Sequence, residues 1–274
     1  MLVTPTLVIL TLVVSTFAGG VGALLGVGGG AFMVPFLVLV GVPFRVAVGT
    51  SLVMIIATSS AVATGNVGRG LINLRLGMLL EVATAAGGLA GGLTAQMLST
   101  STLQTVFAVV AVTIGVIMLL NLGKHEAVID AAGDPGRVGG RFRDEASGRI
   151  QGYRVRRMPV ALAASLVAGN VSGLLGIGGG IVKVPVLVTW CGVPMRAAAA
   201  TSSFMLGVTA TSSAVIYYAH GEVVPALAAT AVLGVQVGTR FGLSIGARAE
   251  VRWLRLLMIA LLFVFAGLMF VRAR

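Results

Sequence analysis

Residues 24–51 read LLGVGGGAFMVPFLVLVGVPFRVAVGTS, and this stretch decides the fold. It is apolar almost throughout and is interrupted by three consecutive glycines, Gly28, Gly29 and Gly30. Each glycine destabilises a helix by about 1 kcal/mol relative to alanine. We therefore expect two short helices that meet at a flexible glycine turn. Pro35 lies one turn into the second helix, where it interrupts the hydrogen bonding.

The same pattern returns in residues 174–202, which read LLGIGGGIVKVPVLVTWCGVPMRAAAATS. When one residue is inserted near Cys191, seventeen of the 28 paired positions are identical. Shared apolar composition would not reproduce GGG, VP, GVPxR and TS in one order, so we infer a duplication. The first membrane repeat is residues 1–122 and the second is residues 158–274. A transporter built from two such halves has its site at their interface, on broken helices near the bilayer midplane.

The composition of the chain points to the lipid bilayer. Of its 274 residues, 57% are hydrophobic and only 10% are charged, against about 25% charged residues in an average soluble domain. A soluble fold of this size could not cover its surface with polar groups. This excludes a soluble enzyme, a nucleic-acid-binding domain and a disordered protein. Long continuous apolar runs also exclude a β-barrel, so we expect an all-α polytopic membrane protein.

A helix needs about 20 apolar residues to cross a membrane, and each half contains three such runs after its glycine-broken hairpin. The runs are 46–66, 76–98, 103–121, 197–218, 225–246 and 253–271. The hairpins occupy residues 5–42 and 159–193. The first eighteen residues carry no Lys or Arg, so we expect a retained membrane segment rather than a cleaved signal peptide.

The net charge of +11 is distributed as in a membrane protein. Eight of the 19 basic residues lie between Lys124 and Arg157, together with five of the eight acids. We expect residues 123–157 to be a mobile cytoplasmic linker, because Lys and Arg gather on the cytoplasmic side. We favour an odd number of crossings in each half, which inverts the halves and puts both termini outside. An even number, with both termini inside, is the alternative.

Taken together, these motifs resemble the sulfite exporter TauE/SafE family, also called TSUP. The family pattern is G-x-GGG-x-x-x-VP-x-L, then a G-x-P segment that ends in TS, then R-G or a similar pair, all of it twice. Arg69-Gly70 supplies this pair in the first half, while His220-Gly221 departs from it in the second. The resemblance covers nearly the whole chain except 123–157. It implies a multi-pass permease of the bacterial inner membrane that moves sulfite, organosulfonates or related anions.

The glycine clusters are candidate anion sites. A half-helix that starts after the triplet presents free backbone N–H groups and the positive end of its dipole, which bind anions without a charged side chain. Glycine lets the ligand approach closely. The alternative is that the glycines only permit tight packing. Hydroxyl groups of the TS pairs could bind sulfonate oxygens or cap the next helices. These candidate substrate-binding residues are Gly28, Gly29, Gly30, Thr50, Ser51, Gly178, Gly179, Gly180, Thr201 and Ser202.

Three charged residues lie in apolar stretches, and their presence there requires a functional or structural explanation. A charge at the bilayer centre costs at least about 2.5 kcal/mol. Lys183, whose repeat partner is Met33, is a candidate substrate cation, with snorkelling to the interface as the alternative. Arg240, with Gln236 one turn earlier, could bind substrate or pair with Glu81. Glu81 is the candidate proton carrier, and a structural ion pair is the alternative for both residues.

The absence of other motifs narrows the function. The sequence has no Walker motif, no cluster with metal-ligand spacing and no Ser-His-Asp set. We expect no enzyme activity, no cofactor and no metal, and a small anionic substrate moved by secondary transport, with export as the expected direction. The rivals are a permease for another small anion or a divalent metal, and a non-transporting membrane subunit or intramembrane enzyme. A homo-oligomer is left open.

Overall fold

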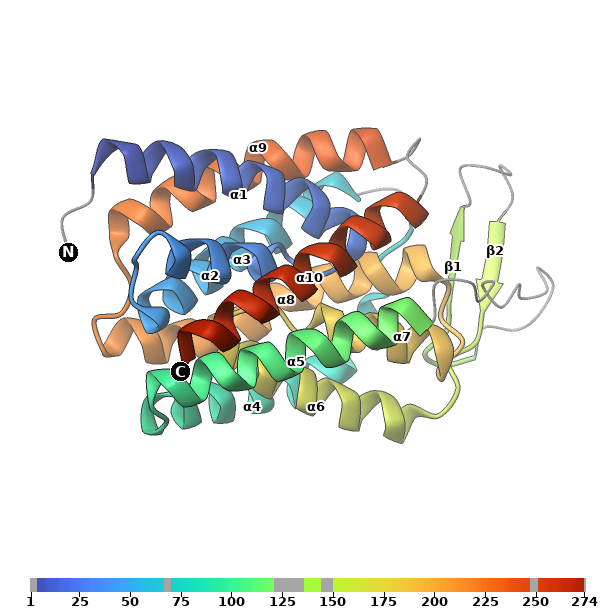
Figure 1. Ribbon diagram of the computed structural model, residues 1–274. Helices are drawn as coiled ribbons and strands as arrows, with labels where there is room; N and C mark the ends of the chain where they lie inside the picture. Colours follow the sequence, from blue (N-terminus) through green and yellow to red (C-terminus); the bar gives the residue numbers. More distant parts are fainter. Residues whose placement is uncertain (1–3, 67–69, 121–135, 144–149, 247–250, 274) are drawn as a thin grey trace.

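The computed structural model describes residues 4–66, 70–120, 136–143, 150–246 and 251–273. These ranges form ten helices and two short strands (Figure 1). They are α1 Pro5–Leu25, α2 Gly30–Leu39, α3 Phe44–Gly65, α4 Leu74–Met97, α5 Thr100–Leu120, β1 Gly140–Arg143, β2 Ile150–Tyr153, α6 Met158–Leu175, α7 Gly180–Thr189, α8 Met195–Ala219, α9 Pro225–Gly246 and α10 Val251–Ala273.

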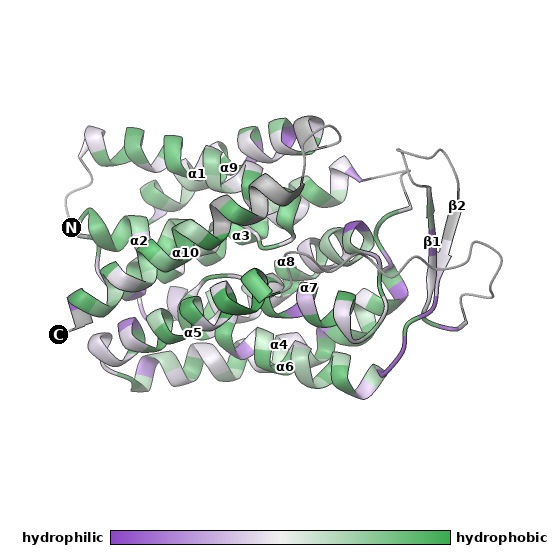
Figure 2. Cartoon of the chain, turned by 45° about the vertical axis from the view of Figure 1, so that its right-hand side comes forward, coloured by the Kyte–Doolittle hydropathy of each residue, from purple (hydrophilic) through white to green (hydrophobic). Residues whose placement is uncertain are grey.

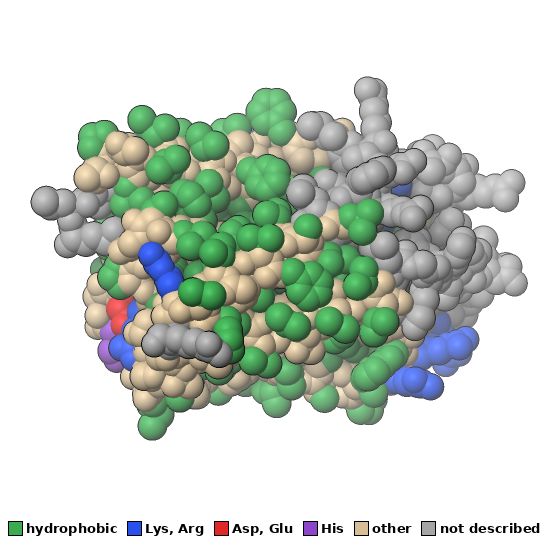
Figure 3. Space-filling model, in the orientation of Figure 1, with side chains coloured by type: hydrophobic (Ala, Val, Ile, Leu, Met, Phe, Trp, Pro, Cys, Tyr) green, Lys and Arg blue, Asp and Glu red, His purple; other side chains and the backbone are tan. Residues whose placement is uncertain are grey.

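Seven helices of the described ranges are long and apolar enough to cross a membrane: α1, α3, α4, α5, α6, α8 and α9. Figure 2 shows apolar residues along the helices and hydrophilic residues near the strands and at the ends of the bundle. Figure 3 shows hydrophobic side chains over the flank of the molecule. The predicted all-α polytopic membrane fold is therefore confirmed.

The glycine triplets break the chain at the predicted places. Gly26 caps the C-terminus of α1 with φ 75°, and Gly28 and Gly29 also have positive φ before α2 begins. Pro35 lies inside α2. The expectation of two short helices is wrong for the first member, because α1 has 21 residues and α6 has 18. Gly19 lies inside α1, where it packs closely against Val235 of α9 instead of ending the helix.

The helices of the two halves interlock. α1 packs on α9, and in the same way α6 packs on α4. Close approach at these contacts comes from glycines at a spacing of four, because a small residue lets two backbones meet. Gly234, Gly238 and Gly242 of α9 face α1, and Gly87 and Gly91 of α4 face α6. α3 and α8 pack against each other at the centre and are the most buried of the membrane-spanning helices.

The two ends of the bundle differ in which segments they carry. Figure 1 places both termini at one end and the strands β1 and β2 at the other. Opposite placement of the linker and the termini is what inverted halves require. The internal repeat, its boundaries and the side of the membrane that each end faces stay predictions.

Part of the linker is folded. β1 pairs antiparallel with β2, and the rings of Phe142 and Tyr153, buried between the hairpin and the helices, lie 6.4 Å apart. The Asn73 side chain donates to the Tyr153 hydroxyl at 3.0 Å and to the Val138 carbonyl at 2.9 Å. The expectation of a mobile linker is wrong for this hairpin, because its two aromatic side chains are docked on the bundle. Residues 123–135 and 144–149 of the linker lie outside the described ranges.

Candidate functional site

The two glycine turns cross at the centre of the molecule and touch each other. Ser51 of α3 donates a hydrogen bond from Oγ to the Gly176 carbonyl at 2.6 Å. In the other half, Ser202 of α8 donates to the Gly26 carbonyl at 3.3 Å. Both serines are fully buried. Each serine is therefore bound to the turn of the opposite half, and we call this arrangement the turn crossing.

The turn crossing leaves no room for side chains on its glycines. A Cβ on Gly30 would collide with the Gly176 carbonyl, and a Cβ on Gly180 with the Gly26 carbonyl. The remaining predicted glycines lie in the same two turns, and a Cβ on any of them would come within 3.0 Å of a neighbouring atom. They are Gly28, Gly29, Gly178 and Gly179. Tight packing is thus one role of these glycines in this conformation.

The carbonyls at the crossing come from helix ends. Gly26 caps the C-terminus of α1 and Gly176 caps that of α6. Each carbonyl lies against the first residue of the opposite short helix, Gly180 of α7 or Gly30 of α2. A helix N-terminus attracts negative charge, and the carbonyl oxygen supplies a partial negative charge there. Each helix start therefore has a carbonyl of the opposite half packed against its first residue.

The two predicted threonines are buried but do not cap helices. α3 begins at Phe44 and α8 at Met195, six residues before Thr50 and Thr201 respectively. The capping alternative is therefore wrong, because Pro43 and Pro194 set the helix starts earlier. Thr201 Oγ1 accepts from the backbone N–H of Asn73 at 3.0 Å. The Thr50 hydroxyl has no hydrogen-bond partner among the described residues.

Lys183 is buried close to the turn crossing, with 1% of its surface exposed. Its backbone N–H bonds to the carbonyl of Gly179 at 3.0 Å, and its Nζ has no hydrogen-bond partner among the described residues. Snorkelling is therefore wrong for this residue. Within the described structure, Glu81 of α4 is the acid whose charge acts on the ammonium, so these two predicted residues interact electrostatically.

Only one of the two carboxylate oxygens of Glu81 has a hydrogen-bond partner in the described part of the chain. Its Oε1 accepts a hydrogen bond from Thr209 of α8 at 3.0 Å. Its Oε2 is buried and has no partner in the described part of the chain. The carboxylate and the Lys183 ammonium attract each other, but no direct ion pair joins them in the described structure. We call Glu81, Lys183 and Thr209 the buried charge site.

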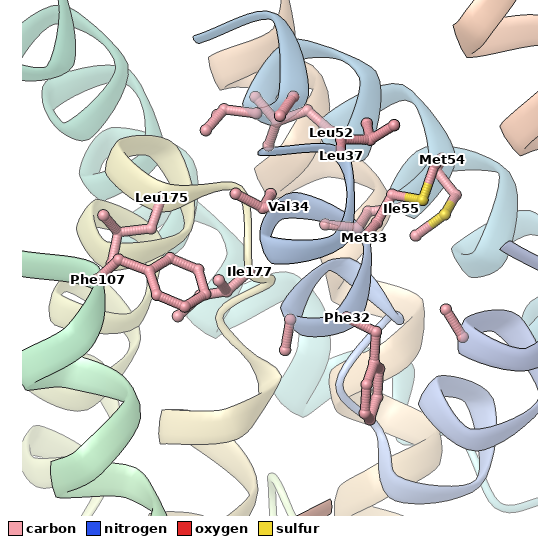
Figure 4. Close-up of a cluster of buried hydrophobic side chains, with 14 of the residues drawn as sticks. Phe32, Met33, Val34, Leu37, Leu52, Met54, Ile55, Phe107, Leu175 and Ile177 are labelled. Atoms are coloured by element: carbon pink, nitrogen blue, oxygen red, sulfur yellow. The ribbon is translucent and has the colours of Figure 1, made fainter. Parts of the chain in front are cut away.

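The buried charge site combines residues of both halves of the sequence, because Glu81 lies in the first half and Lys183 and Thr209 lie in the second. The counterpart of Lys183 is Met33, which is fully buried in an apolar cluster with Met54 and Ile55 (Figure 4). The offset of 151 residues that relates Gly87 to Gly238 relates Glu81 to Val232. Neither charge is therefore repeated at the matching position of the other half.

Arg240 and Gln236 are not part of this arrangement. Arg240 is exposed on α9, whereas the residues of the turn crossing are buried. Gln236 is half-buried and donates from Nε2 to the Ala57 carbonyl at 3.4 Å. The alternative in which Arg240 pairs with Glu81 is wrong, because Glu81 lies with Lys183 and Thr209 instead.

Sequence reasoning missed a second polar group at the end that carries the termini. Arg45 of α3 lies 3.7 Å from the carboxylate of Glu222 in the turn between α8 and α9. Its guanidinium donates to the carbonyls of Gln96 and Leu98 at 3.3 and 2.9 Å, and the Gln96 side chain donates to Glu222 at 2.7 Å. Acidic, basic and histidine side chains gather at this end in Figure 3. Arg45 stands in the repeated GVPxR motif, which was the available signal, but the motif does not reveal its partner.

Comparisons with known proteins find matches along nearly the whole chain. The family model described as Sulfite exporter TauE/SafE matches residues 11–269. The protein named "Probable membrane transporter protein YunE" from Bacillus subtilis (strain 168) is 26% identical over 264 residues, 91% of this chain and 92% of that protein.

A second relative matches only a segment. "Sulfite exporter TauE/SafE family protein 5" from Arabidopsis thaliana is 46% identical over 59 residues, 22% of this chain and 13% of that protein. No solved structure gives a significant match. Because the family model spans nearly the entire sequence, the chain belongs to the sulfite exporter TauE/SafE family of membrane transporters.

Proposed function

We propose that this multi-pass membrane protein is a secondary transporter that exports small sulfur-containing anions, such as sulfite or organosulfonates, across the bacterial inner membrane. The observation that carries the proposal is the buried ammonium of Lys183, which has no hydrogen-bond partner among the described residues. An ammonium has three hydrogen-bond donors. Leaving them all unsatisfied inside a protein is costly, so the position favours an anionic ligand with several oxygens.

The turn crossing provides the rest of the proposed site. The carbonyls of Gly176 and Gly26 lie against the first residues of α2 and α7. A relative movement of the halves would withdraw these carbonyls and free backbone N–H groups for the oxygens of the anion. Ser51 and Ser202, which now donate to the same carbonyls, would then be free to donate to the anion. In this proposal, alternating access consists of exchanging carbonyl for substrate at the crossing.

The family assignment supports the substrate class. The matching family and the Arabidopsis relative carry sulfite in their names, and the Bacillus relative is named as a membrane transporter. A sulfite or sulfonate group presents three oxygens around one sulfur, which suits donors that converge from two helix starts and one ammonium.

Ligand binding by purified protein tests this function. A ligand that binds only the native state stabilises it by about 2.7 kcal/mol at 100 times its dissociation constant. We expect sulfite, thiosulfate or methanesulfonate to raise the melting temperature and acetate to have little effect. Lys183→Met should abolish this stabilisation, because methionine keeps the length of the side chain and removes its charge.

The matched control is Arg240→Met, which removes an exposed cation and should leave the stabilisation intact. Loss of stabilisation in Arg240→Met, with retention in Lys183→Met, would transfer the role of the cation to Arg240. No stabilisation of the unmodified protein by any of the sulfur anions would contradict the proposed function itself.

A further inference from the structure

We propose that Lys183 exchanges its partner between Glu81 and the transported anion, and that Glu81 takes up one proton from solvent for each anion bound. The inference rests on the proposed function and adds the coupling ion and its stoichiometry. It concerns the buried charge site, whose two charges attract each other without an ion pair or hydrogen bond between them in the described structure.

The position of Lys183 suits an exchange of partners. It lies one turn from the start of α7 and therefore next to the turn crossing, where the anion is proposed to bind. In a helix the Cα–Cβ bond tilts toward the N-terminus, so the Lys183 side chain leaves α7 in the direction of the glycine turn. A long flexible side chain without a fixed hydrogen bond can reach one partner or the other. Glu81, by contrast, is fixed through Thr209.

Thr209 can serve Glu81 in both protonation states. The Thr209 hydroxyl lies 3.0 Å from Glu81 Oε1 and 3.2 Å from the carbonyl of Met205. A hydroxyl has one proton to donate and two lone pairs that accept. When Glu81 is ionised, Thr209 donates to it. When Glu81 is protonated, the carboxyl group donates to Thr209, which then donates to the Met205 carbonyl. Neither state leaves this hydroxyl without a partner.

Charge balance provides the coupling. In the empty state, the ammonium of Lys183 and the carboxylate of Glu81 sum to zero. A monovalent anion that binds Lys183 would leave one uncompensated negative charge, and a buried unpaired charge costs several kcal/mol. A proton on Glu81 restores a sum of zero. The loaded state is then an ammonium, an anion and a neutral carboxylic acid, and no group is oxidised or reduced.

Other charges near Glu81 do not replace Lys183 in this balance. α4 packs on α6 and α8, and the sequence of α6 contains no titratable residue. The titratable residues of α8 are Arg196 in its first turn and Tyr217 and Tyr218 near its end. On α4 itself the other charge is Arg75, near the helix start. Lys183 is the one charge of the described chain found to act on Glu81.

The exchange fixes the direction of coupling. Proton and anion enter the site together, so they cross the membrane in the same direction. For a monovalent anion, the loaded and the empty forms of the buried charge site carry equal charge. Export then runs on an outward gradient of the anion that exceeds the inward gradient of protons.

The first test needs no variant. Methanesulfonate and sulfate do not titrate near neutral pH, so protons taken up with them bind to the protein. Calorimetric titration of purified protein at pH 7.5, in two buffers with different ionisation enthalpies, counts these protons. We expect about one proton per methanesulfonate, and an affinity that falls about tenfold for each unit of rising pH. Binding without proton uptake would overturn the inference, whatever the variants do.

The second test assigns the proton to its residue. Glu81→Gln places a permanently neutral group at this position, so it should bind the anion without proton uptake and with an affinity independent of pH. The matched control is Glu222→Gln, because Glu222 is also a partly buried carboxylate next to a cation, and it should keep the full proton uptake. If sulfite is the anion that binds, the difference between the unmodified protein and Glu81→Gln removes the contribution of sulfite's own titration.

The outcomes separate this inference from the proposed function. If no anion binds the unmodified protein, the proposed function fails and the inference fails with it. If anions bind and Lys183→Met abolishes binding, but Glu81→Gln takes up as many protons as the unmodified protein, the inference alone is refuted.

Discussion

Gly180→Ala tests the turn crossing directly. Alanine is favoured over glycine by about 1 kcal/mol inside a helix, and Gly180 is the first residue of α7. The added Cβ would collide with the carbonyl of Gly26, which is backbone and not a flexible side chain. Overpacking of this kind costs about 1–3 kcal/mol. The net effect is a loss of stability of up to about 2 kcal/mol, and the hydrogen bond from Ser202 to the same carbonyl would be disturbed as well.

The matched control is Gly267→Ala in α10, because a Cβ at Gly267 would have no neighbouring atom within 4 Å. This variant should gain helix propensity without a collision. The two alanine variants should therefore differ by about 1–3 kcal/mol, the cost of overpacking alone. Cys191 is buried and is the one cysteine of the chain, so thermal unfolding in detergent can be followed by its labelling with a thiol-reactive dye. Equal melting of the two variants would refute the contact between the turns.

Three further predictions concern polar contacts. Ser51→Ala should cost about 1–3 kcal/mol, because it leaves a buried carbonyl without its donor, whereas Ser60→Ala, at an exposed position of the same helix, should melt like the unmodified protein. Arg45→Met should lower the melting temperature by removing an ion pair and two hydrogen bonds, and Glu222→Gln added to it should cause little further loss if the two residues act as a pair. Burial raises the pKa of Tyr153 above its ordinary value of 10.0, so the folded hairpin retains a proton that the unfolded chain loses. Its contribution to stability is present below pH 10 and should decline above it; Tyr153→Phe should abolish this decline in a proteolysis assay of the linker.

The sequence was informative where local chemistry decides the structure. Glycine triplets break helices wherever they occur, and apolar runs of about 20 residues span membranes, so the breaks and the long helices could be predicted. The length of α1 could not be predicted, because Gly19 and Gly20 are two adjacent glycines, which disfavour a helix. They remain helical since they lie against α9, and that contact is tertiary.

The candidate site also depends on tertiary contacts that local sequence patterns do not reveal. Helical spacing identified Glu81, Lys183 and Arg240 as charges in apolar stretches, but it does not say which helices meet. α9, which carries Arg240, packs on α1 and α3, whereas α4, which carries Glu81, packs on α6 and α8. The partner of Glu81 therefore depends on a packing order that no local pattern records. Thr209 was missed for a related reason, because a threonine in an apolar helix becomes notable only once its neighbour is known.

The interlocking of α1 with α9 has a consequence for how the protein is made. α1 ends at Leu25, and α9 begins at Pro225, 200 residues later. During synthesis, α1 enters the bilayer long before its final partner exists, and its glycine face meets lipid or another helix in the meantime. A contact between segments so distant in the chain forms late. The first half alone therefore lacks the surface that completes it, and assembly of the bundle must wait until nearly all of the chain has been inserted.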